Sequence, residues 1–411
     1  MLDIKFIREN PEKIKKATRD KQLDPKVVDR LLAVDRKRRN LLQKVDRLRA
    51  ARNKLKAMEI EKGRRLKEQL KKLEPSLREV QEEFERLMLL IPNPAKPDVK
   101  VGEDESENEV IKKWGEPTKF DFKPRDHVEL GEMLDLIDVK RTAKISGPRF
   151  GYLKNEAVLL EFALVKFALE TLIKEGFIPV VPPVIIKEEV MEGLGYLEHG
   201  GREDMYVFEK DGLVLVGTSE QSIIPMHADE VLEEKELPKH YVGFSSCFRR
   251  EAGAYGKDTR GIFRVHQFDK VEMIAFTKPE DSDKEHEYLL SLEEKLVQKL
   301  KLPYQVVKMC TGDLGSPAAR KYDIEAWFPG QDRYREITST STCTDFQARR
   351  LNIRYRHQGK VNFVHILNGT AIAIGRVLIA ILENCQQEDG SVQVPEILQK
   401  YVGKKIIKPR E

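Results

Sequence analysis

Charged side chains gather along one stretch of the sequence, residues 241–276. The stretch consists of a strand pattern, a Gly-rich polar loop and a second strand pattern, which is typical of a long β-hairpin. Period-two alternation places these residues on one face of the second strand: Arg264, His266, Phe268, Lys270 and Glu272. Guanidinium groups suit phosphate oxygens, an aromatic ring suits a base, and carboxylates suit an ammonium group. The face could bind a nucleotide, and a solvated outer face remains the alternative.

Further candidates lie on neighbouring patterns. Arg249 and Glu251 share a face of the first strand with smaller residues. In residues 368–384 a strand leads through Gly375 into an apolar helix that begins near Arg376. An arginine in a first helical turn is unfavourable, because its charge opposes the helix dipole. Its positive charge could serve a polyphosphate site, and a solvated side chain at the helix end explains the sequence equally well. Glu336 stands beside hydroxyl residues that could hold Mg²⁺ together with phosphate oxygens.

Several other kinds of site are excluded. The sequence has no GxxxxGK[ST] or HExxH motif, and Gly193-Leu194-Gly195 lacks the third glycine of a dinucleotide fingerprint. The four cysteines lie far apart without a CxxC pair: Cys247, Cys310, Cys343 and Cys385. We therefore expect neither a disulfide framework nor a structural zinc site.

The charge of the 411-residue chain is unevenly distributed. Its formal net charge is +4, and 35% of its residues are charged. The first 90 residues carry 27 Lys and Arg against 16 Asp and Glu, whereas the rest carries 46 against 53. A basic N-terminal module could contact a polyanion, or its charges could form a solvated helical face.

Two heptad series predict an antiparallel coiled-coil hairpin over about residues 27–91. The first series comprises Leu31, Val34, Arg38, Leu41, Val45, Leu48, Arg52 and Leu55. The second comprises Leu66, Leu70, Leu73, Leu77, Val80, Phe84, Leu87 and Ile91. Pro75 should kink the second helix or remove one of its hydrogen bonds. A hairpin that pairs with itself exposes a basic surface, which favours phosphate binding over dimerisation as its role.

The chain has a predicted domain boundary after the Pro-rich and acidic linker of residues 91–110. We predict an N-terminal domain at 1–110 and a second domain at 111–411, which carries the candidate site residues 249–376. In the second domain, helical patterns at 157–174 and 282–300 mix with strands such as 180–186, without a β-α-β rhythm. This favours an α+β fold with an antiparallel sheet flanked by helices. No apolar run approaches the roughly 18 residues that span a bilayer, and no signal peptide is evident, so we expect a cytoplasmic protein without membrane partners.

Taken together, these motifs resemble seryl-tRNA synthetases of the common bacterial type, which are class II aminoacyl-tRNA synthetases. The resemblance begins with MLDIKFIRENPE and extends through the hairpin and the PNP linker. GFIPVVPPVII resembles motif 1, FRREAG with the return RVHQFDKVE resembles motif 2, and GRVLIAILEN resembles motif 3. GTSE, REITSTS and LNGTA match in order. The resemblance implies a ligase that uses ATP to convert L-serine to seryl-adenylate and transfers it to tRNA(Ser), with tRNA(Sec) as a further expected substrate.

The resemblance also implies roles for individual residues. The implied catalytic residues are Arg249 and Arg376. Serine would be bound by Thr218, Ser219, Glu220, Glu272, Asn368 and Thr370. ATP would be bound by Arg249, Arg250, Glu251, Arg264, Val265, Phe268, Glu336, Ser339 and Arg376. Glu336 and Ser339 would hold Mg²⁺, and tRNA would contact Arg38, Arg52, Lys257 and Arg260.

Arg250 departs from the family pattern, which often has FRSEAG, and because it alternates away from Arg249 we expect it to leave the chemistry unchanged. The family further implies a homodimer whose basic arm reads the long variable arm of the tRNA. Three rival functions remain at this point: amino-acid activation for a carrier protein, another class II synthetase, and a non-enzymatic tRNA-binding or scaffold protein.

Overall fold

The computed structural model describes residues 1–55, 59–252, 258 and 260–410. By their internal contacts, the residues form two compact units, Met1–Pro94 and Ala95–Glu411. We call them the N-terminal unit and the catalytic unit.

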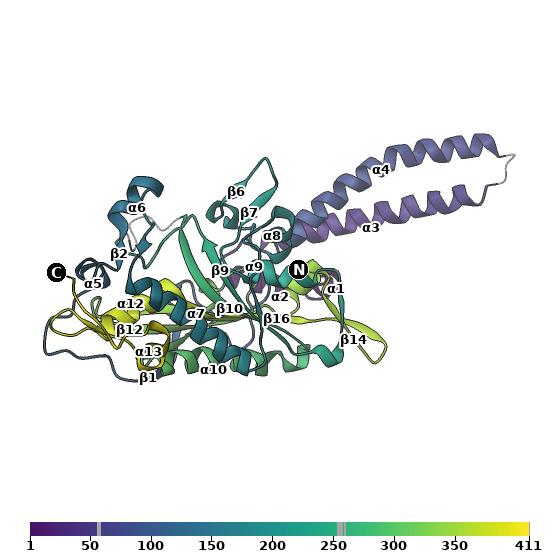
Figure 1. The fold of residues 1–411 in the computed structure, drawn as a ribbon. Helices are drawn as coiled ribbons and strands as arrows, with labels where there is room; N and C mark the ends of the chain where they lie inside the picture. Colours follow the sequence, from purple (N-terminus) through teal and green to yellow (C-terminus); the bar gives the residue numbers. More distant parts are fainter. Residues whose placement is uncertain (56–58, 253–257, 259, 411) are drawn as a thin grey trace. The chain divides into compact units, whose positions relative to one another are not determined.

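The N-terminal unit is helical. It contains α1 (Ile4–Glu9), α2 (Pro11–Asp20), α3 (Lys26–Asn53) and α4 (Ile60–Leu89). The long helices α3 and α4 lie side by side as the predicted hairpin (Figure 1). Heptad side chains from both helices are buried along it: Leu31, Val45, Leu70, Val80 and Leu87. Pro75 lies inside α4, which continues to Leu89, so the proline does not end the helix.

A buried carboxylate joins the helices at one end of the hairpin. Asp35 of α3 is 1% exposed and accepts two hydrogen bonds from Arg8 of α1, at 2.7 and 2.8 Å. Arg38 and Arg39 each donate to the same carboxylate at 3.1 Å. Burial would raise the pKa of Asp35, but the hydrogen bonds from Arg8 and Arg38 lower it below its usual value. The carboxylate therefore stays ionised and fixes α1 against α3.

The catalytic unit is built on a sheet that has eight strands among the described residues, ordered β1-β11-β12-β13-β16-β10-β9-β4. Its strands are β1 (Glu109–Trp114), β11 (Tyr304–Lys308), β12 (Arg320–Phe328), β13 (Arg333–Thr342), β16 (His365–Ala373), β10 (Gln267–Thr277), β9 (Lys239–Phe248) and β4 (Ile178–Val180). All neighbours are antiparallel except β4, which runs parallel to β9. The predicted α+β fold with an antiparallel sheet is confirmed.

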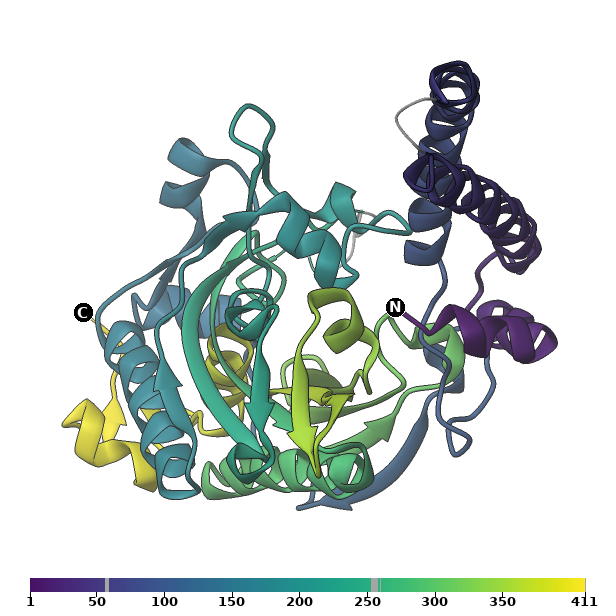
Figure 2. The same ribbon diagram turned by 90° about the vertical axis from the view of Figure 1, so that its right-hand side faces the viewer.

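Three long helices pack on one face of this sheet, as Figure 2 shows: α7 (Glu156–Lys174), α10 (Ser282–Lys299) and α12 (Ile374–Asn384). Their apolar side chains form the main core with the strand residues that point toward them, among them Val271 and Met273 of β10. Residues of the opposite alternation, including Phe268, Lys270 and Glu272, are left for the other face. The core thus decides which strand residues can form a site.

Shorter elements complete the unit. The helices are α5 (His127–Met133), α6 (Val139–Ser146), α8 (Glu188–Leu194), α9 (Glu220–Ile223), α11 (Phe346–Leu351) and α13 (Glu396–Val402). The small sheets join β5 (Ile185–Lys187), β7 (Leu213–Leu215) and β6 (Val207–Phe208); β15 (Lys360–Phe363), β14 (Arg354–His357) and β8 (Val231–Glu233); β2 (Ile137–Asp138) and β3 (Tyr152–Leu153); and β17 (Val392–Gln393) and β18 (Ile406–Ile407).

Two details differ from the sequence prediction. The strand expected over 180–186 is divided into β4, which ends at Val180, and β5, which begins at Ile185. Pro182 and Pro183 lie between them and cannot donate backbone hydrogen bonds to a ladder. The predicted hairpin consists of β9 and β10, but Arg249, Glu251 and Arg264 lie in the connection rather than on the strands. Within the described residues, no helix is both long enough and apolar enough to cross a membrane.

Candidate active site

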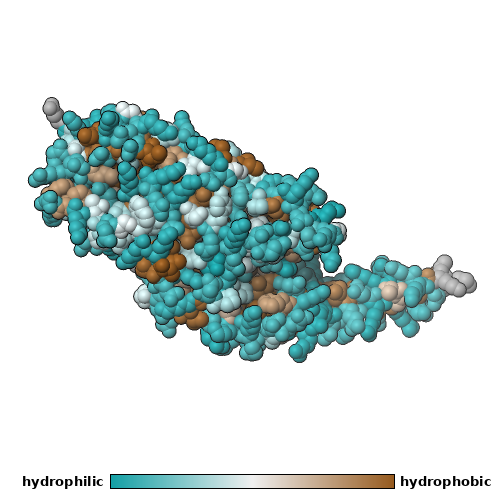
Figure 3. Space-filling model, turned by 90° about the horizontal axis from the view of Figure 1, so that it is seen from below, coloured by the Kyte–Doolittle hydropathy of each residue, from teal (hydrophilic) through white to brown (hydrophobic). Residues whose placement is uncertain are grey.

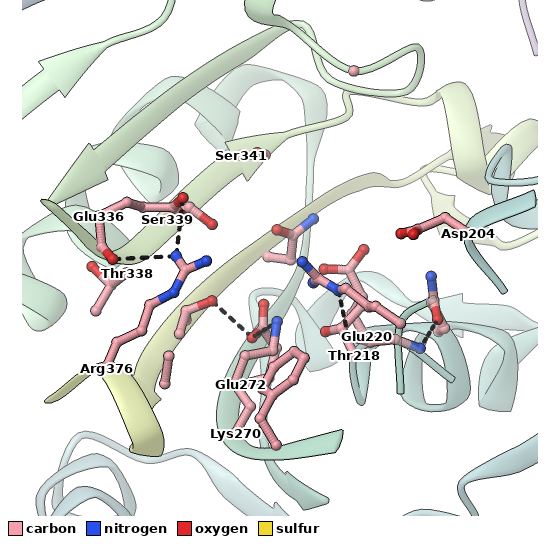
Figure 4. Close-up of a pocket in the computed structure, with 18 of the residues that line it drawn as sticks. Asp204, Thr218, Glu220, Lys270, Glu272, Glu336, Thr338, Ser339, Ser341 and Arg376 are labelled. Atoms are coloured by element: carbon pink, nitrogen blue, oxygen red, sulfur yellow. Dashed lines mark hydrogen bonds and ion pairs between the residues drawn. The ribbon is translucent and has the colours of Figure 1, made fainter. Parts of the chain in front are cut away.

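A cavity of about 450 Å³ opens on the sheet face that the core helices leave uncovered. Strands β10, β13 and β16 form its floor, and the segment that leads into α9 forms one wall (Figure 4). Predicted residues that line the cavity are Thr218, Glu220, Arg249, Glu251, Arg264, Val265, Phe268, Glu272, Glu336, Ser339, Asn368, Thr370 and Arg376. The fold therefore brings together residues that are separated by up to 158 positions.

The remaining predicted residues lie elsewhere. Ser219 is fully buried beside the cavity, next to Gly243 of β9. Arg250 is not among the lining residues, and its backbone N–H donates to the carbonyl oxygen of Asp204 at 2.8 Å. Arg260 is exposed, and Lys257 lies outside the described residues.

One end of the cavity holds two buried carboxylates. Glu272 forms an ion pair with Lys270, with 2.8 Å between Oε2 and Nζ, and accepts a hydrogen bond from Thr370 Oγ1 at 3.1 Å. Glu220 accepts a hydrogen bond from the hydroxyl of Tyr196. Burial and the negative charge of Glu272 raise the pKa of Glu220 to about 7. This end is therefore suited to a cationic group, which would favour the charged form of Glu220.

Two hydroxyl groups at the same end have unused hydrogen-bonding capacity. Thr218 Oγ1 and Ser219 Oγ are buried without a hydrogen-bond partner among the described residues. The segment that carries them is fixed, because Gly217 N–H donates to Gln221 Oε1 at 2.7 Å. A buried polar atom costs free energy unless it is paired, so Thr218, which lines the cavity, is placed to bind a polar ligand.

Arginines occupy the rest of the cavity. Arg249 donates through Nε to the carbonyl oxygen of Gly217 at 3.2 Å, and its guanidinium lies 5.3 Å from the centre of the Phe268 ring. Arg264 donates to Glu251 at 2.5 Å. Fixed guanidinium groups and the half-buried ring of Phe268 in one cavity are suited to a nucleotide.

Glu336 and Arg376 form an ion pair at the cavity wall, with 3.0 Å between the oxygen and nitrogen atoms (Figure 4). Burial alone would raise the pKa of Glu336, but the charges of Arg376 and Lys321 lower it to about 2. Glu336 is therefore an anion at neutral pH. Among the described residues, no group of three or more His, Cys, Asp and Glu side chains could hold a metal ion by itself.

Sequence reasoning missed several lining residues: Tyr196, Asp204, Asp313, Lys321, Ser341 and Cys343. Lys321 and Ser341 stand opposite each other on β12 and β13, and strand alternation beside Ser339 could have indicated Ser341. Tyr196 follows α8 and carries no periodic signal, because only the tertiary fold brings it to Glu220.

Comparison with known proteins identifies the family. The model of the seryl-tRNA synthetase N-terminal domain matches residues 1–95, and that of the tRNA synthetase class II core domain (G, H, P, S and T) matches residues 206–385. A serine–tRNA ligase of Dictyoglomus turgidum is 47% identical over 425 residues, which cover 100% of both chains. The chain belongs to the seryl-tRNA synthetase family.

Solved structures of seryl-tRNA synthetases agree over the whole chain. The enzyme of Pyrococcus horikoshii complexed with ATP has a TM-score of 0.94 at 44% identity and covers 100% of both chains. The cytoplasmic enzyme of Naegleria fowleri in complex with AMP has a TM-score of 0.90 at 35% identity, with 100% of this chain and 99% of that chain covered. The protein is a ligase that joins serine to tRNA with ATP as the nucleotide substrate, and the predicted activity is confirmed.

A further carboxyl group lies behind the serine–tRNA ligase cavity. Glu293 of α10 is fully buried, and its Oε2 accepts a hydrogen bond from Thr338 Oγ1 at 2.8 Å. Burial and the charges of Glu272 and Asp323 raise the pKa of Glu293 well above its usual value. The folded chain therefore holds this proton to a higher pH than the unfolded chain does.

We expect Glu293→Gln to become more stable relative to the wild type as the pH rises. The native protein holds a proton that the unfolded chain loses above about pH 4.5, so the unfolding free energy of the wild type falls with pH, by up to about 1.4 kcal/mol per pH unit. The glutamine keeps the hydrogen bond to Thr338 and has no proton to lose. Thermal and urea unfolding at pH 5 and pH 7 test this by tryptophan fluorescence, since Trp114 and Trp327 both belong to the catalytic unit.

Glu287→Gln is the matched control, because the Glu287 side chain on the same helix is 55% exposed. Its stability difference from the wild type should change little between the two pH values. An equally pH-independent difference for Glu293→Gln would contradict a protonated Glu293.

Proposed function

We propose that serine is bound between the two carboxylates at the β10 end of the cavity. Its ammonium group would lie between Glu220 and Glu272, which are 4% and 1% exposed. Asn368 and Thr370 of β16 and the unpaired hydroxyl of Thr218 would bind its polar groups, with Ser219 supporting the wall. The observation that carries this proposal is the pair of buried carboxylates in one cavity, because a cation bound between them would add to the stabilisation of their negative charges.

The proposed ATP site begins beside the serine pocket. Arg249 would hold the α-phosphate and the carboxylate of serine, and Arg264 and Arg376 would contact the triphosphate. Phe268 and Arg376 would pack on the adenine ring, while Glu251 and the backbone of Val265 would read its edge. Arg250 was expected to bind ATP by resemblance, and its place outside the cavity lining gives it at most an indirect role in this proposal.

Mg²⁺ would be held by Glu336 and Ser339 together with phosphate oxygens. The two side chains line the cavity from the same strand, β13, and Glu336 is ionised. One carboxylate and one hydroxyl fit this ion, because Mg²⁺ in nucleotide sites takes few protein ligands and completes its shell with phosphates and water. When bound, the ion would supply positive charge at the phosphate oxygens.

The chain itself would activate serine by positioning and by fixed charge. The carboxylate of serine attacks the α-phosphorus in line, and pyrophosphate leaves. Negative charge then grows on the phosphate oxygens, where the guanidinium of Arg249 needs little reorganisation because the carbonyl of Gly217 already fixes it. In the second step the 3′-hydroxyl of the terminal tRNA ribose attacks the carbonyl of the adenylate and releases AMP.

Arg249→Ala should reduce serine-dependent ATP–pyrophosphate exchange by about 100-fold or more, because it removes a fixed charge at the reacting phosphate. Exchange is measured with saturating ATP and varied serine. Arg356→Ala is the matched control, since Arg356 lies on β14, has a side chain 57% exposed and does not line the cavity. Near-normal exchange in Arg249→Ala would refute the proposed role.

The basic hairpin is the proposed tRNA-binding element. In this proposal residues 1–110 form the tRNA-binding domain, with its arm at about 27–91, and residues 111–411 form the catalytic domain. Arg52 is exposed near the end of α3 and forms no ion pair among the described residues, so it suits a phosphate contact. Arg38 is bound to Asp35 and lies 4.1 Å from the Phe84 ring centre, so its contribution would be to hold the arm in shape. Arg260 and Lys257 are the proposed contacts from the catalytic domain.

Replacing residues 30–90 by a short linker should abolish tRNA charging and spare pyrophosphate exchange, because the exchange reaction needs only the catalytic unit. Both activities are measured on the same preparation. Arg52→Gln should weaken tRNA binding several-fold and reduce its salt dependence by about one phosphate contact. Normal charging by the shortened chain would show that the hairpin does not bind the substrate.

A homodimer is proposed from the apolar surface of the catalytic unit. The surface is mostly hydrophilic with local hydrophobic patches (Figure 3). Large apolar side chains are exposed along α7 and beside β4: Leu159, Phe162, Ile173, Ile178 and Val181. Val181 is 83% and Phe162 61% exposed, which is costly unless another surface covers them.

Phe162→Glu should therefore shift the protein from dimer to monomer, because it places a charge in the proposed apolar interface. Sedimentation velocity across a concentration series measures the change. Val361→Glu on β15, where the residue is 47% exposed, is the control that should leave the sedimentation coefficient unchanged. A monomeric wild type would contradict the dimer.

The remaining proposals follow from the family resemblance alone. We infer a cytoplasmic location and the charging of tRNA(Sec) with serine where the host has that tRNA. A transcript of the host's tRNA(Sec) tests the second proposal directly in the charging assay.

A further inference from the structure

Tyr196 is a cavity residue for which the activity as described gives no role. It lines the cavity, and its hydroxyl donates a hydrogen bond to Glu220 Oε1. Burial raises its pKa well above the usual value of tyrosine, so the hydroxyl keeps its proton and remains a donor. Glu220 itself is 4% exposed. The contact is therefore a buried hydrogen bond from a neutral donor to a carboxylate.

The fold fixes Tyr196 on both sides. Gly195 ends α8 in the left-handed conformation, with φ at 86°, and turns the chain toward the cavity. Gly201 packs so closely that a Cβ atom there would lie 1.9 Å from the carbonyl oxygen of Tyr196. Between them, Glu198 forms an ion pair with Arg350 of α11, with 2.6 Å between oxygen and nitrogen and both side chains at most 8% exposed. These contacts place the phenol without help from the ligand.

The charges around Glu220 come from several elements. Glu272 and Lys270 face it from β10, Arg249 from the end of β9, and Tyr196 from the segment after α8. Burial and Glu272 oppose ionisation of Glu220, whereas Lys270, Tyr196 and Arg249 favour it. Cys343 also lines the cavity and lies near Tyr196. Lys270 forms its ion pair with Glu272, at 2.8 Å. Glu220 instead accepts a direct hydrogen bond from Tyr196.

We propose that Tyr196 is a positioning residue, which orients Glu220 and keeps it charged for the ammonium group of serine. This inference rests on the proposed serine pocket. A carboxylate without this hydrogen bond would take up a proton more easily and could rotate away from the ligand. Tyr196 would thus set the affinity for serine, and the lowest pH at which serine binds, without touching the reacting atoms.

The test is the pH dependence of serine-dependent ATP–pyrophosphate exchange in Tyr196→Phe, between pH 5.5 and 8.5. The phenyl ring keeps the packing and loses the donor. The KM for serine should rise about tenfold at pH 6.5, and the pH below which this KM increases should move upward by about 0.5 to 1 unit. The kcat at saturating serine should stay within about twofold of the wild type, because the bound ammonium group then keeps Glu220 charged. The KM for ATP should also stay within about twofold, because ATP does not contact Glu220 in the proposed site.

Tyr355→Phe is the matched control, a 4%-exposed tyrosine of β14 in the apolar cluster against which Tyr196 packs. Tyr355→Phe should leave the pH dependence of the serine KM and that of kcat unchanged. A serine KM of Tyr196→Phe within twofold of the wild type at every pH would overturn the proposal. A fall in kcat together with a rise in the KM for ATP, without an upward shift of the pH below which the serine KM increases, would also overturn it. That pattern indicates a merely structural role.

Glu220→Gln separates this proposal from the pocket on which it rests. If Glu220→Gln raises the serine KM and Tyr196→Phe does not, the pocket stands and the role of Tyr196 is wrong. If Glu220→Gln leaves the serine KM unchanged, the proposed serine pocket is wrong, and the role of Tyr196 is overturned with it.

Discussion

The cavity is organised by the cost of burying two carboxylates close together. Glu220 and Glu272 are at most 4% exposed, and burial together with the charge of Glu272 raises the free energy of ionised Glu220. A buried charge is tolerated only with partners, so each carboxylate has its own: Lys270 and Thr370 for Glu272, and Tyr196 for Glu220. These partners come from β10, β16 and the segment after α8, and the rest of the fold serves to bring those elements together.

The sequence predicts part of this arrangement for a clear physical reason. Alternation on β10 places Phe268, Lys270 and Glu272 on one face, and the core takes the other face. The same alternation fails for Arg249 and Arg264, which lie beyond the strand ends, where backbone geometry no longer has a period of two. Tyr196 could not be predicted, because its role depends on Gly195, Gly201 and an ion pair to a helix about 150 residues later in the chain.

The N-terminal unit shows the same contrast. Heptad spacing is a local property, so it predicts the pairing of α3 and α4, and Arg38 occupies a seam position against Phe84. The network around Asp35 joins residues 27 positions apart through side-chain hydrogen bonds, which leave no pattern in the sequence. It also means that part of the basic excess of this unit is used internally. The charge available to a polyanion is therefore smaller than the composition suggests.

Discrimination against alanine follows from the same electrostatic constraint. In the proposed pocket the hydroxyl of Thr218 has no protein partner among the described residues, and Thr370 donates to Glu272. An amino acid without a hydroxyl group would leave such buried polar groups unpaired, which costs more than the loss of the same contact in water. Threonine presents the opposite problem, since its hydroxyl is present and only the extra methyl group distinguishes it. One methyl group in a pocket is worth only about 1–3 kcal/mol, so exclusion of threonine must depend on rigid walls. The backbone packs closely around Tyr196 and Ser219, since a Cβ atom on Gly201 would collide with the carbonyl oxygen of Tyr196 and one on Gly243 would crowd Ser219, and this packing favours such rigidity.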